Sequence, residues 1–240
     1  HVYECIFLGS IMKTRKKIIR TTTIPLSLYT FCRGLFEDLS QEYDLVAISS
    51  PGELLDELAQ DQTCRCVAIP MERSISPFKD LVSLWRLIQV FRKEKPDMVH
   101  SMTPKAGLLS MMAAWITRVP VRIHTFTGLV FPTSTGLKRK ILMLTDRITC
   151  ACATHIIPEG EGVKQDLQQH GITQKELKVL GYGNIKGIDL KHYDRTPEIT
   201  EQAAAIRQKL NLKDDDFTSG FNFFWDVIAT KFKGDIFNSP

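Results

Sequence analysis

Short, almost continuously apolar runs recur along the chain between residues 17 and 180, and longer amphipathic stretches separate them. An apolar run without alternation is typical of a strand that is buried on both faces, as in a parallel sheet. The runs that predict strands are Lys17–Thr23, Tyr43–Ser50, Cys64–Met71, Met98–Val99, Val121–His124, Thr154–Ile157 and Leu177–Leu180.

The stretches between these runs have the spacing of helices. The clearest is Ser76–Lys95, where Ser76 and Pro77 supply a cap and a first-turn proline, and apolar residues recur every three or four positions up to Phe91. The other predicted helices are Pro25–Gln41, Leu54–Ala59, Ala106–Thr117, Gly136–Cys150 and Gly162–His170. Strands that alternate with helices predict an α/β fold, a Rossmann-like parallel sheet with helices on both faces.

The pattern changes after residue 181. A glycine-rich loop, 181–189, is followed by a weakly helical segment at Thr200–Leu210, and the aromatic-rich residues 217–240 follow neither period. We predict a non-native leader at 1–11, one Rossmann-like domain at 12–193 and a linker at 194–216. Residues 217–240 are expected to be an aberrant or truncated start of a second domain.

Composition narrows the class of protein. The 240 residues are 43% hydrophobic and 24% charged, which is ordinary for a globular protein, and a net charge of +4 implies no nucleic-acid partner. Basic residues cluster at 13–20 and at 138–140. They are either a solvated surface or a contact with an anionic membrane surface. No segment approaches the roughly 20 apolar residues that span a bilayer, and we predict a cytoplasmic protein, peripheral at the inner face of the cell membrane if the basic residues bind it.

Six cysteines include two C-x-C pairs, Cys64 with Cys66 and Cys150 with Cys152. No histidine or cysteine follows either pair at the spacing of zinc ligands, so we interpret them as reduced, buried thiols. A redox or metal role is the alternative. We predict no metal site.

Polar residues gather where two neighbouring predicted strands end, at His100 and at His124, which is where open α/β sheets bind ligands. Lys105 lies at a helix start, where its charge is favourable beside a bound phosphate; otherwise it is a solvated lysine. His124, Thr127 and Gly128 either contact sugar hydroxyls or form an ordinary turn. His100 is either a ligand-facing donor or structural, and Glu159 either faces a ligand or belongs to a capped loop. The chain has no G-x-G-x-x-G, which argues against a dinucleotide cofactor.

Three segments, 71–81, 96–122 and 179–189, resemble family 4 glycosyltransferases of the GT-B type, in the branch that builds bacterial capsule and O-antigen polysaccharide. The first contains Ser76-Pro77 and Asp80-Leu81, the second Thr103-Pro104-Lys105-Ala106-Gly107, and the third Gly181-Tyr182-Gly183 and Gly187-Ile188-Asp189. The resemblance covers about residues 12–193 and corresponds to the N-terminal, acceptor-binding half of such an enzyme.

The resemblance implies transfer of a hexose, with retention, from a nucleotide sugar such as a UDP- or GDP-hexose to a polyprenyl-diphosphate-linked saccharide, without a further cofactor. It implies acceptor contacts at Thr23, Pro25, Ser27, His100, Thr103, Lys105, Thr127 and Gly128, a catalytic role for His124, and a domain junction with donor-side residues at Glu159, Gly183, Asn184, Gly187 and Asp189.

The chain departs from that family's pattern at Thr127, at residues 158–161, and after Gly220, where no donor-domain motif follows. We therefore expect a truncation near Ser219 and no sugar transfer by this chain alone. Two alternatives stay open: a non-catalytic module that binds the acceptor or a membrane, and a sugar-nucleotide epimerase of GT-B architecture.

Overall fold

The computed structural model describes residues 15–72, 74, 76–184, 194 and 196–213, and the backbone of 217–223 and 226–232. The chain divides into two compact units, 1–187 and 188–240, which are considered separately here. The predicted leader at 1–11 and the predicted site residues Gly187 and Asp189 lie outside the described residues.

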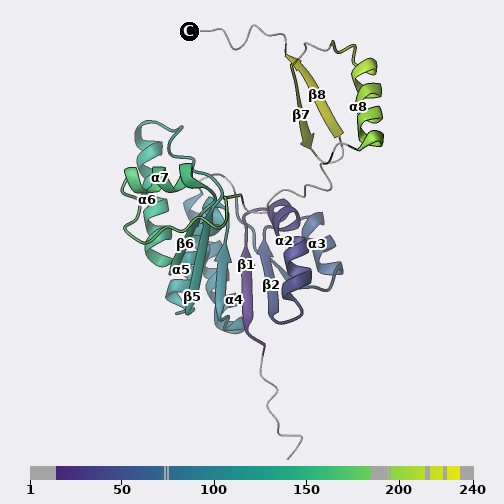
Figure 1. The fold of residues 1–240 in the computed structure, drawn as a ribbon. Coiled ribbons are helices and arrows are strands. Elements are labelled where there is room, and N and C mark those ends of the chain that lie inside the picture. The colour runs from purple at the N-terminus through teal and green to yellow at the C-terminus, as the bar shows by residue number, and fades with distance from the viewer. Residues whose placement is uncertain are drawn as a thin grey trace, which may run out of the picture. The chain divides into compact units, whose positions relative to one another are not determined.

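The first unit alternates strands and helices (Figure 1). Its strands are β1 (Lys17–Thr21), β2 (Asp44–Ser49), β3 (Arg65–Ala68), β4 (Met98–Ser101), β5 (Val121–Phe126) and β6 (His155–Pro158). Its helices are α2 (Pro25–Leu39), α3 (Glu53–Gln60), α4 (Pro77–Glu94), α5 (Pro104–Ile116), α6 (Gly136–Cys152) and α7 (Glu161–Gln169). Prolines stand at the first turns of α2, α4 and α5, where a missing N–H costs nothing.

All six strands are parallel and lie in the order β3-β2-β1-β4-β5-β6. The order reverses between β1 and β4, so the connections on the two sides of that point diverge and leave room at the carboxyl ends of the strands. The Rossmann-like sheet predicted from the apolar runs is confirmed. The predicted strand at Leu177–Leu180 is wrong: only Leu177 bridges to β6, while Leu180 is 56% exposed and buries too little apolar surface to continue the strand.

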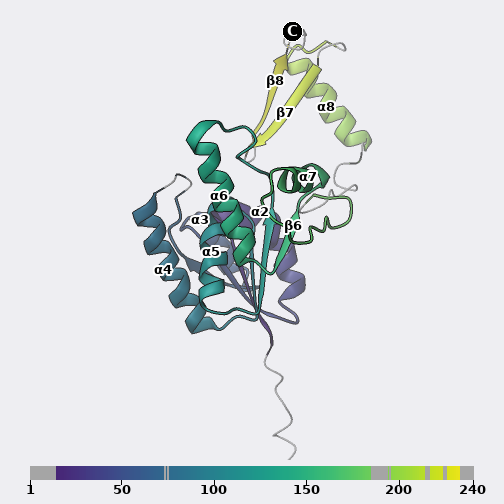
Figure 2. The ribbon, with the colours of Figure 1, turned by 90° about the vertical axis from the view of Figure 1, so that its left-hand side faces the viewer.

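The two faces of the sheet carry separate apolar clusters. One cluster joins β1, β2 and β4 to residues of α4, α5 and α6, among them Leu87, Phe91 and Leu109. The other joins the opposite face of β1 and β2 to α2 and α3, through Phe36 and Leu58. Figure 2 shows α4, α5 and α6 from the side of the first face. The sheet is therefore covered on both faces, as near-continuous apolar strands require.

Helix α4 differs from the expected buried amphipathic helix in its first half. Leu87 and Phe91 are buried, but Phe78, Leu81, Val82 and Trp85 are exposed, Phe78 by 87% and Trp85 by 60%. These four residues recur at helical spacing, so they form one exposed apolar stripe, called the α4 stripe below.

The second unit contains one helix, α8 (Pro197–Lys209), and a hairpin of β7 (Phe217–Phe223) and β8 (Asp226–Phe232), among the residues described. Thr196 caps α8 by accepting a hydrogen bond from the N–H of Ile199. The hairpin is antiparallel, with Phe217 opposite Phe232. In the part of the chain that the structure describes, no helix is long and apolar enough to cross a membrane.

Candidate functional site

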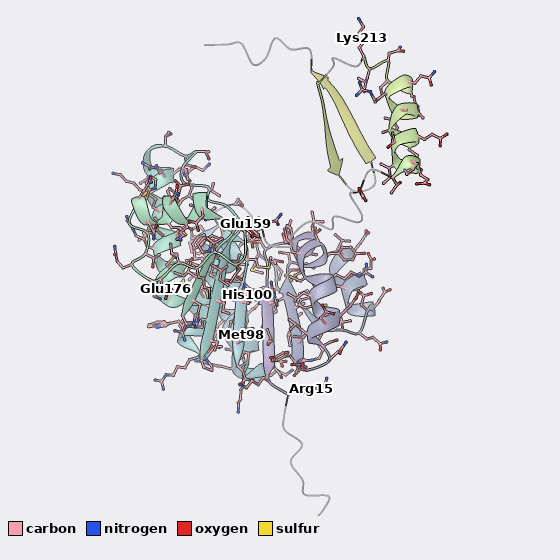
Figure 3. All side chains as sticks on the ribbon, in the orientation of Figure 1. Arg15, Met98, His100, Glu159, Glu176 and Lys213 are labelled. Atoms are coloured by element: carbon pink, nitrogen blue, oxygen red, sulfur yellow. The ribbon has the colours of Figure 1, made fainter. Side chains whose placement is uncertain are left out.

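A cavity of about 250 Å3 lies at the carboxyl ends of the strands in the first unit, where the strand order reverses. Parallel α/β sheets bind ligands at this position. Figure 3 shows two wall residues, His100 and Glu159, and, at the opposite end of the sheet, Arg15. The lining residues are Arg20, Leu35, His100, Thr125, Ile157, Pro158, Glu159, Leu180 and Asn184.

Arg20 and His100 share one face of the sheet because they are register partners on β1 and β4. Arg20 is only 7% exposed. One of its terminal nitrogens, Nη2, donates to the thioether of Met102 at 3.1 Å, and its Nε has no partner in the structure. A thioether is a weak acceptor, so the guanidinium is buried without the carboxylate that normally accompanies it.

His100 is fixed from one side by a hydrogen bond between its Nε2 and the Thr125 hydroxyl, at 2.8 Å. Burial holds the pKa of His100 well below its usual range, and the charges of Arg20 and His124 act in the same direction. The imidazole is therefore neutral at neutral pH. Its Nδ1 makes no hydrogen bond among the described residues, which leaves it for a ligand in the cavity.

His124 lies one register step away, on the opposite face, where α5 covers the sheet. It is 1% exposed, and its Nδ1 hydrogen-bonds the Ser101 hydroxyl at 2.8 Å. Its ring packs at right angles to Phe126 and against Gly107, where an added Cβ would come within 2.3 Å of it. Burial lowers the pKa of His124 to about 3. It does not line the cavity, and its catalytic role stays a prediction.

Thr23 and Thr103, both expected at the acceptor, join two of the loops that follow strands. Their hydroxyl oxygens lie 2.7 Å apart, and the Thr103 hydroxyl also accepts from the N–H of Thr23 at 2.8 Å. The Thr23 hydroxyl accepts from the N–H of Ala106, which satisfies one of the orphan donors at the start of α5. Pro25 and Ser27 are half-buried in the first turn of α2. These contacts show how the loop is held; they do not test acceptor binding.

Lys105 is neither solvated nor left open for a phosphate in this structure. Its Nζ lies 2.5 Å from a carboxylate oxygen of Asp80 and donates to the carbonyl of Ser74 at 2.8 Å. The side chain of Lys105 is 11% exposed. The anion expected beside this lysine is thus the carboxylate of α4, and two of the segments that carry the family resemblance are tied together by the pair.

Three of the predicted junction residues meet beside the cavity. The N–H of Asn184 donates to the carbonyl of Glu159 at 2.8 Å, and Glu159 in turn donates its N–H to Phe126. Gly183 has φ +90°, and a Cβ there would lie 2.6 Å from the Glu159 carbonyl, so only glycine fits. Thr127 and Gly128 follow β5, Thr127 half-buried and Gly128 exposed, outside the cavity wall.

The sequence pattern did not identify Arg20 or Leu35 as residues of this cavity. Arg20 was interpreted as part of a basic surface cluster, which is wrong because it belongs to β1 and is buried. Lys17 of the same cluster is paired with Asp44 and Glu94. The usable signal was position: Arg20 stands inside an apolar strand, where a charged residue is out of place.

A wider, open depression of about 810 Å3 lies beside the start of β2 and includes Cys64 and Cys66, whose sulfurs are 3.9 Å apart. No predicted site residue lines it, so we consider the smaller cavity the candidate site. The described cysteines are all free. Among the described residues there is no group of three or more metal-ligating side chains.

The chain is similar to a known protein family and to several known proteins. The family model of the glycosyl transferase 4-like domain matches residues 30–183, more than half of the chain. The capsular polysaccharide biosynthesis glycosyltransferase CapM of Staphylococcus aureus is 35% identical over 208 residues, 86% of this chain and 52% of CapM.

A second curated relative is the UDP-Gal:alpha-D-GlcNAc-diphosphoundecaprenol alpha-1,3-galactosyltransferase of Escherichia coli. It is 33% identical over 124 residues, 49% of this chain and 31% of that protein. Among solved structures, Anabaena HepE in complex with UDP superimposes with a TM-score of 0.56 at 14% identity, over 82% of this chain and 50% of HepE. The chain spans about half the length of these proteins or less, and its fold corresponds to half of a GT-B fold.

Proposed function

The chain belongs to the family 4 glycosyltransferases, and we propose that it serves transfer of a hexose from a nucleotide sugar to a lipid-linked saccharide in surface polysaccharide synthesis. The first unit would bind the acceptor, and residues outside it would bind the nucleotide sugar. The observation that carries the proposal is the cavity at the reversal of strand order, with a neutral histidine on its wall.

The relatives support the substrates. CapM is named for capsular polysaccharide biosynthesis, and the Escherichia coli enzyme is named for a UDP-sugar donor and a diphosphoundecaprenol-linked acceptor. HepE was solved with UDP. We propose a UDP-hexose donor, a polyprenyl-diphosphate-linked acceptor and transfer with retention, which the anomeric configuration of the product would test by NMR.

In this proposal His100 contacts an acceptor hydroxyl through its Nδ1, while Thr125 holds the ring by Nε2. Thr127, Gly128 and the loop at Thr23–Ser27 would border the entrance, and Glu159 with Gly183 and Asn184 would form its donor side. His124 would keep β4 and α5 in place, one strand position from His100. The role proposed for His124 is positioning, since it lies on the other face of the sheet.

Acceptor binding by the 240-residue chain is the first test. We expect His100→Ala to weaken binding of a short-chain prenyl-diphosphate saccharide by about tenfold, because one neutral hydrogen bond contributes about 1 kcal/mol and a buried partner is left unpaired. His155→Ala is the matched control, since His155 is exposed on β6 and lines no part of the cavity. Equal binding by the two variants would contradict the assignment.

The α4 stripe supports a second element of the proposal, docking on the inner membrane surface. Phe78 and Trp85 are the two exposed aromatic residues of the stripe, and the basic residues Lys79 and Arg86 lie on the same helix. We therefore propose α4, and not the basic cluster at 13–20, as the membrane contact.

Sedimentation with vesicles that contain phosphatidylglycerol tests the docking. We expect Phe78→Ser with Trp85→Ser to abolish binding. Trp115→Ser is the control, because Trp115 is equally exposed but lies in the last turn of α5, which leads to the start of β5, whereas the α4 stripe lies in the first half of α4. Loss of binding in the control alone would show that the contact lies elsewhere.

A further inference from the structure

The buried guanidinium of Arg20 is the one charged group of the cavity wall whose position the fold itself does not explain. Away from the cavity it adjoins an apolar cluster on the same face, which contains Ile18, Cys32 and Met102. Among the described residues its one hydrogen bond is to a sulfur atom, and its Nε is buried with no partner there. A buried charge without a carboxylate is destabilising, so its presence calls for a partner that arrives from outside.

We infer that Arg20 binds an oxyanion, a phosphate or carboxylate group, of the ligand that enters this cavity. A planar guanidinium with free N–H groups matches both groups, which accept two hydrogen bonds from it at once. The neutral ring of His100, its register partner, adds a possible donor without adding charge. At about 250 Å3 the cavity holds one small charged group and several waters.

Glu159 is the internal competitor for Arg20. It lies on the same cavity wall, yet the described residues show no ion pair between it and Arg20. Half-buried at the wall, its carboxylate would repel an entering anion at short range. If Glu159 only repels the anion, removing its charge should tighten binding of the oxyanion. If Glu159 were instead a true partner of Arg20, removing its charge should leave the oxyanion site unfilled and lower the stability of the fold. This opposite expectation makes Glu159→Gln an informative variant.

The inference rests on the proposed function only for the source of the oxyanion, which is either the diphosphate of a lipid-linked acceptor or the carboxylate of an acidic sugar. Titration of the 240-residue chain with inorganic phosphate, with methyl glucuronide and with uncharged methyl glucoside separates these. Chemical shifts of the His100 ring report binding in this cavity, since it faces Arg20.

We expect phosphate or glucuronide to bind, and Arg20→Met to weaken that binding at least about tenfold, as for a charged hydrogen-bonding group. Arg20→Lys should bind with intermediate affinity and Glu159→Gln more tightly than the wild type. Binding of phosphate alone assigns the diphosphate, and binding of glucuronide alone assigns an acidic sugar. If Arg20→Met does not fold, the comparison of Arg20→Lys with Glu159→Gln decides.

Equal affinity in wild type and Arg20→Met, or no effect of either anion on His100, would overturn the inference and leave a cavity that holds only water. Binding of the lipid-linked saccharide is a separate readout. Oxyanion binding in a protein that does not bind the prenyl-diphosphate saccharide would support the inference and overturn the proposed function.

Discussion

His100 and His124 end neighbouring strands of one sheet, yet they meet opposite surroundings. His124 faces α5, where Ser101, Phe126 and Gly107 leave it no free space. His100 faces a cavity, with one nitrogen held by Thr125 and Arg20 beside it. We call these sides the closed face and the open face.

The difference between the faces follows from alternation along a strand. Side chains at consecutive positions point to opposite faces, so His100 and Ser101 on β4 pair with Thr125 and His124 on β5 by two hydrogen bonds, one on each face. The strand ends are thereby fixed from both sides. The closed face, where the Ser101 hydroxyl and His124 are hydrogen-bonded to each other, supports an open face that keeps polar groups for a ligand, as preorganised sites require.

The largest predicted effect on stability is its loss at low pH, through His124 on the closed face. The folded pKa of His124, about 3, lies below the unfolded value near 6.5, so its contribution is full above pH 6.5 and is lost as the pH falls toward 3. Between pH 6.5 and 4 the loss should be about 3 kcal/mol, at about 1.4 kcal/mol per pH unit. Urea unfolding at each pH measures it, and His124→Gln should flatten the curve.

His155→Gln is the control for that titration, since His155 is exposed. His100→Gln should also reduce the slope, because burial depresses the pKa of His100 in the same direction. A curve that stays steep in His124→Gln would show that other groups carry the acid sensitivity.

Filling the contact between α5 and His124 should have the next largest effect. In Gly107→Ala the new methyl group meets the imidazole ring, and overpacking of this kind costs about 2 kcal/mol of unfolding free energy. Gly34→Ala in α2 is the matched control: nothing lies within 4 Å of the added carbon, so helix propensity should raise stability by about 0.5 kcal/mol. Equal effects of the two substitutions would mean that the closed face is looser than described.

The third prediction asks whether Lys105, at the start of α5, has a structural or a ligand-binding role. A double-mutant cycle on Lys105→Ala and Asp80→Ala should give a coupling of about 1 to 2 kcal/mol, because both side chains are largely buried. The exposed pair of Lys79 with Glu72 should couple by less than about 0.5 kcal/mol. Coupling near zero between Lys105 and Asp80 would instead favour a ligand-binding role for Lys105.

Substitution on the open face should have the smallest effect on stability and of the opposite sign. Arg20→Met replaces a buried, unpaired charge by an apolar side chain of similar length, so unfolding free energy should rise by about 1 kcal/mol. Thermal and urea unfolding without ligand measure it. A loss of stability instead would show that Arg20 has a partner within the protein and is not available to a ligand.

The sequence by itself determined the parallel sheet, because buried strands and helix starts are local patterns. The apolar run at Leu45–Ile48 indicates a buried strand, and Pro77 indicates the first turn of a helix. It also placed polar residues at the ends of β4 and β5. The domain boundaries and the role of each site residue stay predictions. The sequence carried no sign that Leu177–Leu180 would leave the sheet, since this depends on contacts with β6.

Only the tertiary structure decided which histidine faces a cavity, which lysine already has its anion, and that Arg20 belongs to the site and not to the surface. Each of these depends on residues far apart in the chain: Lys105 meets Asp80 across 25 positions, and Arg20 meets Met102 across 82. Residue type and spacing specify the strand that a side chain stands on. The partner that it finds there is set by how the strands are ordered and which helix covers each face.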